Sequence, residues 1–193
     1  EAAGRRWRID AVRDQDALLA AADGFERFPY GLLLWDSAPV LADALAGLGD
    51  LTGMRVLELG AGVGLAGLAA RHLGADVVQA DHSPEALELA RANAAANGIE
   101  GIVQELADWT DWTPPGQCDL VLGSDILYDE AAHAAVGRVL GAGLAPGGIA
   151  LLTDPGRTAT PAFLKAMRAA GWRIEAATRQ VPALNPARAG EHA

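Results

Sequence analysis

Short hydrophobic runs alternate with longer amphipathic stretches along most of the chain. The short runs have the length of buried strands, and they lie at 54–59, 76–80, 102–105, 119–123, 149–153 and 172–177. The longer stretches are predicted as helices at 38–47, 65–73, 83–97, 130–142 and 160–170. Strands that alternate with helices are typical of βα units. The pattern therefore predicts an α/β fold with a doubly wound, mostly parallel sheet.

The alternation runs on without an internal repeat or a linker between domains. We therefore expect a single domain over 1–193, with an N-terminal lead-in at 1–50 and a core at 54–178. A chain of 193 residues, 51% of them hydrophobic, is long enough for one substantial core. The final stretch, 181–193, contains two prolines and no apolar alternation, so no seventh strand is predicted.

A glycine-rich segment, VLELGAGVGLAG at 56–67, directly follows the first predicted strand. Gly60, Gly62 and Gly64 allow the backbone to turn sharply and to approach a ligand closely. The next helix then presents its N-terminal N–H groups to the same place. Since ligands of open α/β sheets bind at the carboxyl ends of the strands, the segment predicts a nucleotide-containing ligand there.

Two classes of cofactor use such a loop. Gly62, Gly64 and Gly67 satisfy G-x-G-x-x-G, and Asp81 lies 19 residues after Gly62, which resembles a dinucleotide site. Glu58 instead gives E-x-G-x-G-x-G, and a carboxylate there favours a ligand with a cationic end over a pyrophosphate. More than fifty residues also precede this strand, whereas dinucleotide domains commonly start with it. The second class is therefore favoured.

The E-x-G-x-G-x-G segment resembles motif I of class I S-adenosylmethionine-dependent methyltransferases, which have a Rossmann-like fold. Three further segments narrow the resemblance: FPYGLLLWDSAPVLADAL at 28–45, GSDILYDE at 123–130 and DPGRTATPAF at 154–163. The first two resemble methyltransferase family 16, the seven-β-strand protein-lysine methyltransferases. The third resembles the electron transfer flavoprotein β-subunit lysine methyltransferases within that group. The family has a seventh strand, which is not evident here.

The resemblance implies S-adenosyl-L-methionine as cofactor and a set of residues that contact it. Asp81, at the end of the second strand, is expected to bind the ribose hydroxyls, although it could also cap the following helix. Asp108 and Trp109 are expected at the adenine, although Trp109 or Trp112 could instead be a core residue. The full set of expected cofactor residues is Trp35, Glu58, Gly60, Gly62, Gly64, Asp81, Asp108, Trp109 and Ser124.

Asp125 and Tyr128 form the family's D-x-x-Y motif and are the candidate catalytic residues. A lysine amine is almost entirely protonated at neutral pH, so the site must favour its neutral form or accept its proton. Asp125 is expected to orient the amine and Tyr128 to border the path of the methyl group. Asp125 could instead cap the helix near 130, and Tyr128 could be a core-edge aromatic. Arg157 is expected either to bind an acidic substrate group or to pair with Asp154.

Several functions are compatible with these motifs. In-line methyl transfer to a protein lysine is favoured. The alternatives are an N-methyltransferase for a small amine or a nicotinamide-like heterocycle, and a cofactor-binding protein without catalysis. A nucleic-acid methyltransferase is a weaker fourth, because the SDILY segment lacks the Pro-Pro-aromatic loop expected of base-directed enzymes.

Composition restricts the partners further. A formal charge of −10 disfavours nucleic acid and favours a cationic, lysine-bearing protein. No apolar run suggests a membrane segment, and His82 and His133 lack metal-ligand spacing, so no metal is expected. A lone cysteine, Cys118, fits a cytoplasmic protein. Arginine greatly outnumbers lysine, which suggests a bacterial source with a GC-rich genome.

Overall fold

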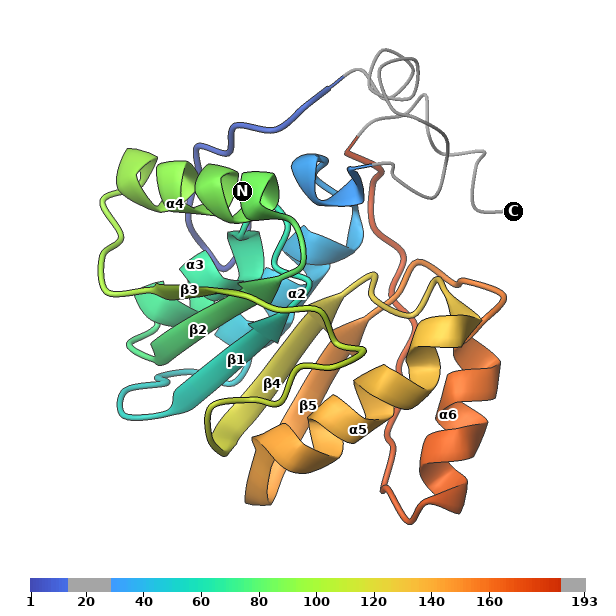
Figure 1. The fold of residues 1–193 in the computed structure, drawn as a ribbon. Helices are drawn as coiled ribbons and strands as arrows, with labels where there is room; N and C mark the ends of the chain where they lie inside the picture. The colour runs from blue at the N-terminus through green and yellow to red at the C-terminus, as the bar shows by residue number, and fades with distance from the viewer. Residues whose placement is uncertain (14–28, 185–193) are drawn as a thin grey trace.

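The computed structural model describes residues 1–13 and 29–184. Residues 14–28, which belong to the predicted N-terminal lead-in and include the start of the segment at 28–45, lie outside the described residues. Residues 185–193, at the end of the predicted domain, lie outside them as well. Figure 1 shows the described chain folded around a central twisted sheet.

Five parallel strands form this sheet, in the order β3-β2-β1-β4-β5. The strands are β1 (Arg55–Leu59), β2 (Asp76–Asp81), β3 (Val103–Leu106), β4 (Cys118–Ser124) and β5 (Leu144–Thr153). β1 lies at the centre. The chain adds β2 and β3 on one side of β1 and then β4 and β5 on its other side, so the direction in which strands are added reverses at β1. The α/β sheet predicted from the hydrophobic pattern is confirmed.

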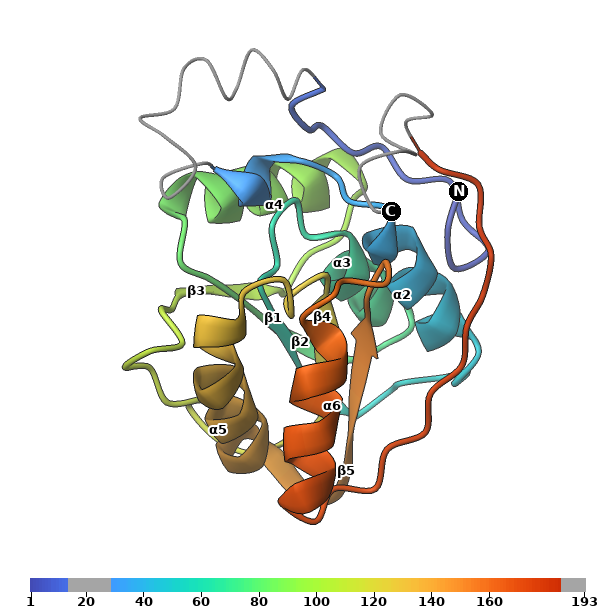
Figure 2. The same cartoon turned by 90° about the vertical axis from the view of Figure 1, so that its right-hand side faces the viewer.

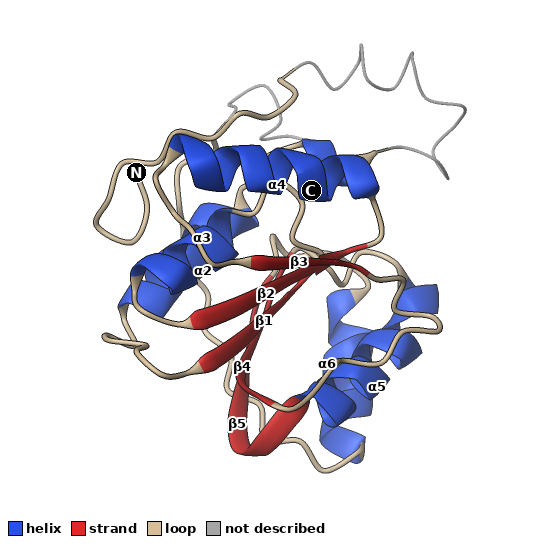
Figure 3. Cartoon of the chain, turned by 60° about the vertical axis from the view of Figure 1, so that its left-hand side comes forward, coloured by secondary structure: helices blue, strands red, loops and turns tan. Residues whose placement is uncertain are grey.

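Helices cover both faces of the sheet. They are η2 (Tyr30–Leu32), α2 (Ser37–Ala46), α3 (Leu65–His72), α4 (Pro84–Ala96), η3 (Glu130–Ala132), α5 (His133–Gly143) and α6 (Thr160–Ala169). Figure 3 shows α2, α3 and α4 on one face and α5 and α6 on the other. This is the doubly wound, Rossmann-like arrangement.

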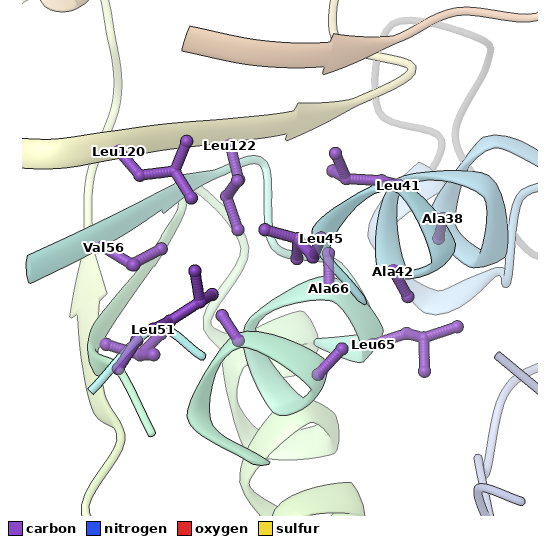
Figure 4. Close-up of a cluster of buried hydrophobic side chains, with 14 of the residues drawn as sticks. Ala38, Leu41, Ala42, Leu45, Leu51, Val56, Leu65, Ala66, Leu120 and Leu122 are labelled. Carbon is purple, nitrogen blue, oxygen red and sulfur yellow. The ribbon is translucent and has the colours of Figure 1, made fainter. Parts of the chain in front are cut away.

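Side chains on the two faces of β1 pack into two separate hydrophobic clusters. Val56 packs with α2 and α3, where Leu41 and Leu45 are fully buried, as Figure 4 shows. The next residue, Leu57, packs on the opposite face with α5 and α6. Side chains alternate between faces along a strand, so a continuous apolar run is what a strand buried on both faces requires.

Local signals explain where α4 begins. Ser83 caps the helix, its hydroxyl accepting a hydrogen bond from the Ala86 N–H at 3.1 Å. Pro84 occupies the first position, where no N–H is needed, and Glu85 lies at the positive end of the helix dipole. Gly98 follows the helix with φ of 65°. These are the start and stop signals that the sequence indicated.

The strand predicted at 172–177 is wrong. Trp172 and Ile174 alternate onto the hydrophobic cluster beside α6, which explains the apolar pattern. The backbone there pairs with no strand among the described residues, and the sheet ends at β5. Figure 2 shows the chain after α6 continuing as a loop. Side-chain packing alone produced the alternation, while a strand also needs a hydrogen-bonded neighbour.

β5 also begins earlier than predicted. The turn expected at Gly147 and Gly148 lies inside the strand, which starts at Leu144. The pairing of β4 with β5 shifts register between Cys118 and Leu120, so the glycines accompany a bulge instead of a turn. No helix among the described residues is long and apolar enough to span a bilayer.

Candidate active site

A cavity of about 250 Å³ opens at the carboxyl ends of the strands. Its walls come from the loops that follow β1, β2, β3 and β4, and the segment from η2 to Trp35 covers it. The structure brings nine of the predicted site residues to its lining: Trp35, Gly60, Gly62, Asp81, Asp108, Trp109, Ser124, Asp125 and Tyr128. Glu58 and Gly64 do not line it.

The loop after β1 is packed so closely that Gly60, Gly62 and Gly64 leave no room for a side chain. Gly60 has φ of 62°, and an added Cβ would lie 2.9 Å from Ile126 and 3.3 Å from Trp109. Gly62 has φ of 51°, and its Cβ would lie 3.2 Å from the carbonyl oxygen of Gly31. Gly60 and Gly62 also line the cavity, so a ligand can come close to the backbone there.

Asp81 ties this loop to the start of α4. Its buried carboxylate accepts a hydrogen bond from the Gly62 N–H at 2.8 Å and another from the Ser83 N–H at 2.9 Å. The cap of α4 is the Ser83 hydroxyl, so Asp81 supports the loops and is not the helix cap itself. Each carboxylate oxygen can accept further hydrogen bonds, which leaves capacity for ligand hydroxyls.

Glu58 lies beneath the glycine loop and faces away from the cavity. The carboxylate, 2% exposed, accepts hydrogen bonds from the Gly67 N–H at 3.0 Å and the Gln79 side chain at 2.8 Å. Gln79 also donates to the carbonyl of Gly64. Burial raises the pKa of the Glu58 carboxyl from 4.5 to about 7, although these hydrogen bonds oppose the rise. The direct contact with a cationic ligand end suggested by the sequence is not what this geometry offers.

This buried carboxyl makes the stability of the protein depend on pH. The folded chain holds the proton up to about pH 7, and the unfolded chain only to about 4.5. The stabilisation from this group is therefore complete below pH 4.5 and is lost as the pH rises through 7, by roughly 3 kcal/mol. We expect Glu58→Gln to remove this loss when urea unfolding is compared between about pH 5 and pH 8. Exposed Glu88→Gln is the control, and equal slopes for the parent and Glu58→Gln would contradict the assignment.

The loop after β3 places Trp109 in the cavity wall. Its indole N–H is buried and has no hydrogen-bond partner within the part of the chain that the structure describes. Arg138 of α5 fixes the loop by donating to the backbone carbonyls of Trp109, Thr110 and Trp112. A buried donor without an acceptor is costly, so a ligand acceptor at this position is favoured.

Neighbouring groups in the same loop have structural partners. Asp108 accepts hydrogen bonds from the backbone and side chain of Thr110, which lower the pKa of its carboxyl. The Trp112 indole donates to Glu105, and its ring packs on the hydrophobic cluster. The expectation of a core tryptophan therefore fits Trp112, whereas Trp109 both packs on the cluster and lines the cavity.

Aromatic side chains border the mouth of the cavity. The Trp35 indole donates to the Tyr30 carbonyl at 3.0 Å. The Tyr30 ring centroid lies 5.6 Å from that of Tyr128, whose side chain is half exposed. Burial of its inner part raises the pKa of the Tyr128 hydroxyl. Thr153, at the end of β5, donates to the Ser37 carbonyl and fixes the covering segment to the sheet.

Asp125 follows β4 directly and has a strained backbone, with φ of 55°. Its N–H donates to the Thr153 carbonyl at 2.8 Å. Arg157 donates to both carboxylate oxygens, from Nε at 2.9 Å and from Nη2 at 2.7 Å. Asp129 caps η3 by accepting from the Ala131 N–H. The helix-cap alternative for Asp125 therefore does not describe this structure.

Sequence reasoning missed the pairing of Arg157 with Asp125. From Arg157, Asp154 accepts a hydrogen bond of the backbone N–H and none of the guanidinium; it also accepts from the Gly156 N–H and the Thr160 hydroxyl. Paired charges 32 residues apart leave no signal in one sequence. A polar residue in a buried strand, Gln79 within DVVQAD, was a readable signal for the network around Glu58. Within residues 1–13 and 29–184, no cluster of three His, Cys, Asp or Glu side chains could hold a metal.

Two solved structures with a similar fold are described as methylating enzymes. The ribosomal protein L11 methylase of Lactobacillus delbrueckii subsp. bulgaricus superposes with a TM-score of 0.62 and 24% identity, over 73% of this chain and 72% of that one. The glycopeptide N-methyltransferase MtfA, solved in complex with S-adenosyl-L-methionine, gives a TM-score of 0.52 and 25% identity over 61% of this chain and 54% of that one. The Rossmann-like methyltransferase fold is thereby confirmed.

Among curated relatives, the protein N-lysine methyltransferase METTL21A of Danio rerio is 42% identical over 125 residues. The match covers 60% of this chain and 56% of that protein. The chain thus spans about half the length of the curated relatives it matches.

The family described as lysine methyltransferase matches residues 13–169. This range includes the glycine loop, the D-x-x-Y motif and Arg157, so the resemblance inferred from these segments is confirmed. The narrower likeness to the electron transfer flavoprotein β-subunit branch stays a prediction. Motif, fold and matched range agree, and the chain belongs to the lysine methyltransferase family.

Proposed function

We propose that this protein transfers a methyl group from S-adenosyl-L-methionine to the side-chain amine of a protein lysine. The observation that carries the proposal is the convergence of two halves in one cavity. The glycine loop, Asp81 and Trp109 form one half, and Asp125 and Tyr128 form the other. The first half suits a nucleoside, and the second offers a carboxylate and an aromatic wall to an amine.

The first half fits the cofactor on grounds of chemistry and shape. Asp81 has free acceptor capacity for ribose hydroxyls. Trp109 lines the cavity with a ring on which adenine can stack, and its indole N–H has no acceptor among the described residues. Bare backbone at Gly60 and Gly62 allows close approach, and Trp35 covers the cavity. Asp108 and Ser124 complete the wall. Glu58 and Gly64 lie behind the loop, and we assign them to holding its shape.

The cofactor, when bound, supplies a methyl group already activated by the sulfonium charge. The protein must then hold a neutral amine in line with the breaking bond and exclude water. Asp125 lies where it can accept a hydrogen bond from the amine and orient its lone pair. Tyr128 and Tyr30, whose ring centroids lie 5.6 Å apart, form the aromatic wall beside which a lysine side chain would enter.

A protein acceptor is supported by the curated relative, whose name specifies N-lysine methylation of proteins. The net charge of −10 also attracts a cationic protein surface and speeds encounter at low salt. A small amine or a nicotinamide-like heterocycle is the alternative acceptor. A cofactor-binding protein without catalysis is disfavoured by the polar groups assembled in the acceptor half.

Two further proposals concern organisation and location. The lead-in at 1–50 belongs to the same domain as the core at 54–178, which is supported by hydrogen bonds from Arg8 and Asp10 to Asn97 and Asn93 of the α4 region. Work in a reducing cytoplasm is supported by the free Cys118. A bacterial source rests on composition alone and stays a prediction.

Calorimetry and label partition together test the function. We expect S-adenosylmethionine and its demethylated product to bind with one site per chain. Incubation with methyl-labelled cofactor and a bacterial lysate should place the label in protein. Label confined to the small-molecule fraction would contradict a protein acceptor, and absence of cofactor binding would contradict the whole proposal. Because Lys165 is the single lysine of the chain, Lys165→Arg controls for self-labelling at that side chain.

A further inference from the structure

Arg157 stands where three segments of the site meet. Its guanidinium donates to both oxygens of Asp125, which follows β4. Its backbone belongs to the turn after β5, where the N–H donates to Asp154 at 2.8 Å. Its Cζ atom lies 5.7 Å from the ring centroid of Trp35 in the segment that covers the cavity. One side chain therefore contacts both the acceptor half of the site and the segment that covers the cavity.

The contact with Arg157 fixes the orientation of the Asp125 carboxylate and places a positive charge beside it. Only 4% of the Asp125 side chain is exposed, against 27% for Arg157, so the guanidinium replaces the water that an exposed carboxylate would contact. Two parallel N–H groups hold the plane of a carboxylate, which a lysine ammonium cannot do. The left-handed backbone of Asp125, at φ of 55°, persists because such contacts hold it.

Arg157 lies behind Asp125, outside the lining of the cavity. Asp125 lines the cavity, but Arg157 is absent from its lining, so the guanidinium reaches an acceptor through the carboxylate. Its own position is fixed by the turn: Asp154 accepts from the Gly156 N–H, the Arg157 N–H and the Thr160 hydroxyl at the start of α6. The DPGR segment thus builds a rigid base for the arginine.

We propose that Arg157 is a positioning residue that fixes the Asp125 carboxylate toward the acceptor amine and ties it to the Trp35 cover. This inference rests on the proposed function, and it adds a residue outside the cavity to the machinery of transfer. It also assigns a role to the turn after β5, because this turn fixes the position of Arg157, and Arg157 in turn fixes the orientation of the Asp125 carboxylate.

The test compares Arg157→Met, which removes the charge, with Arg157→Lys, which keeps a charge but not the fork. The acceptor is the protein fraction that takes up label in the lysate experiment. For Arg157→Met we expect kcat to fall about 100-fold, because a small misplacement of a reacting group has that effect. The Kd for S-adenosylmethionine should stay within about fivefold, since the cation–π contact is weak. Arg157→Lys should remain at least about 10-fold below the parent.

A double-mutant cycle distinguishes positioning from general support. If Arg157 acts through Asp125, adding Arg157→Met to Asp125→Asn costs no further activity. Exposed Arg173→Met, which breaks a surface pair with Glu175, is the matched control and should equal the parent. Thermal unfolding checks each variant, and Arg157→Lys carries the comparison if the Met variant does not fold.

The outcomes of these experiments distinguish failure of the positioning role from failure of the proposed methyltransferase function. The positioning role alone would be overturned if the activity loss of the double variant equalled the product of the two single losses. It would also be overturned if a variant at Arg157 were as active as the parent. A weakened Kd for the cofactor with unchanged kcat would overturn it too, since Arg157 would then act only through Trp35. A parent protein that transfers no methyl group to protein would remove the proposed function and this inference together.

Discussion

Replacing Asp125 by asparagine should lower methyl transfer about 1,000-fold while cofactor affinity changes by less than about threefold. The carboxylate lines the acceptor half of the cavity, and its two oxygens are held by Arg157 in one orientation. Asparagine keeps the size but turns an N–H₂ toward the guanidinium or the amine, where an acceptor is needed. Calorimetry measures the affinity, and label incorporation measures the rate.

The matched control lies on the same strand. Asp119, near the start of β4, accepts a hydrogen bond from the Arg55 N–H at the end of the sheet away from the cavity. Asp119→Asn keeps that acceptor and should transfer methyl groups at the parent rate. If Asp125→Asn retains parental turnover, the carboxylate is structural and the acceptor half of the site has been misassigned.

A methyl group added at Gly60 should weaken binding of S-adenosylmethionine at least about 30-fold. The new Cβ would lie 2.9 Å from Ile126 and 3.3 Å from Trp109, so the cavity wall that we assign to the adenine must move. The left-handed φ of 62° adds a penalty of roughly 1 kcal/mol for alanine. Calorimetric titration with S-adenosylmethionine measures the change in Kd for Gly60→Ala against the parent.

Gly98 separates crowding of the site from backbone strain. It has nearly the same backbone angle, φ of 65°, and an added Cβ would meet no atom within 4 Å. Gly98→Ala should therefore lose a similar amount of unfolding free energy while its Kd for S-adenosylmethionine stays at the parental value. Equal loss of affinity in both variants would show that global destabilisation, not the loop, controls binding.

The hydrophobic pattern was sufficient for the central sheet because parallel strands buried on both faces leave continuous apolar runs. The same pattern misplaced a strand at 172–177, since Trp172 and Ile174 pack on a cluster without a backbone partner. Caps such as Ser83 were readable because capping is local. The bulge in β5 was not, because it depends on the register with β4.

The site was predictable where its residues follow a strand. Asp81 ends a parallel strand, and Gly60, Trp109 and Asp125 come directly or shortly after one, so the topology gathers them at one edge. The direction in which a side chain points was harder to predict than the position of its residue in the fold. Glu58 sits among these residues in sequence, yet the alternation of β1 turns it beneath the loop.

The central claim is that the methyl group goes to a protein lysine, and mass spectrometry of the labelled protein tests it most directly. The protein is incubated with isotopically labelled S-adenosylmethionine and a bacterial lysate, with Asp125→Asn as the low-activity control. We predict labelled methyl groups on lysine side-chain nitrogens of a lysate protein, reduced about 1,000-fold in the control. Labelled methyl groups on arginine or another residue, or in small molecules alone, would contradict the account.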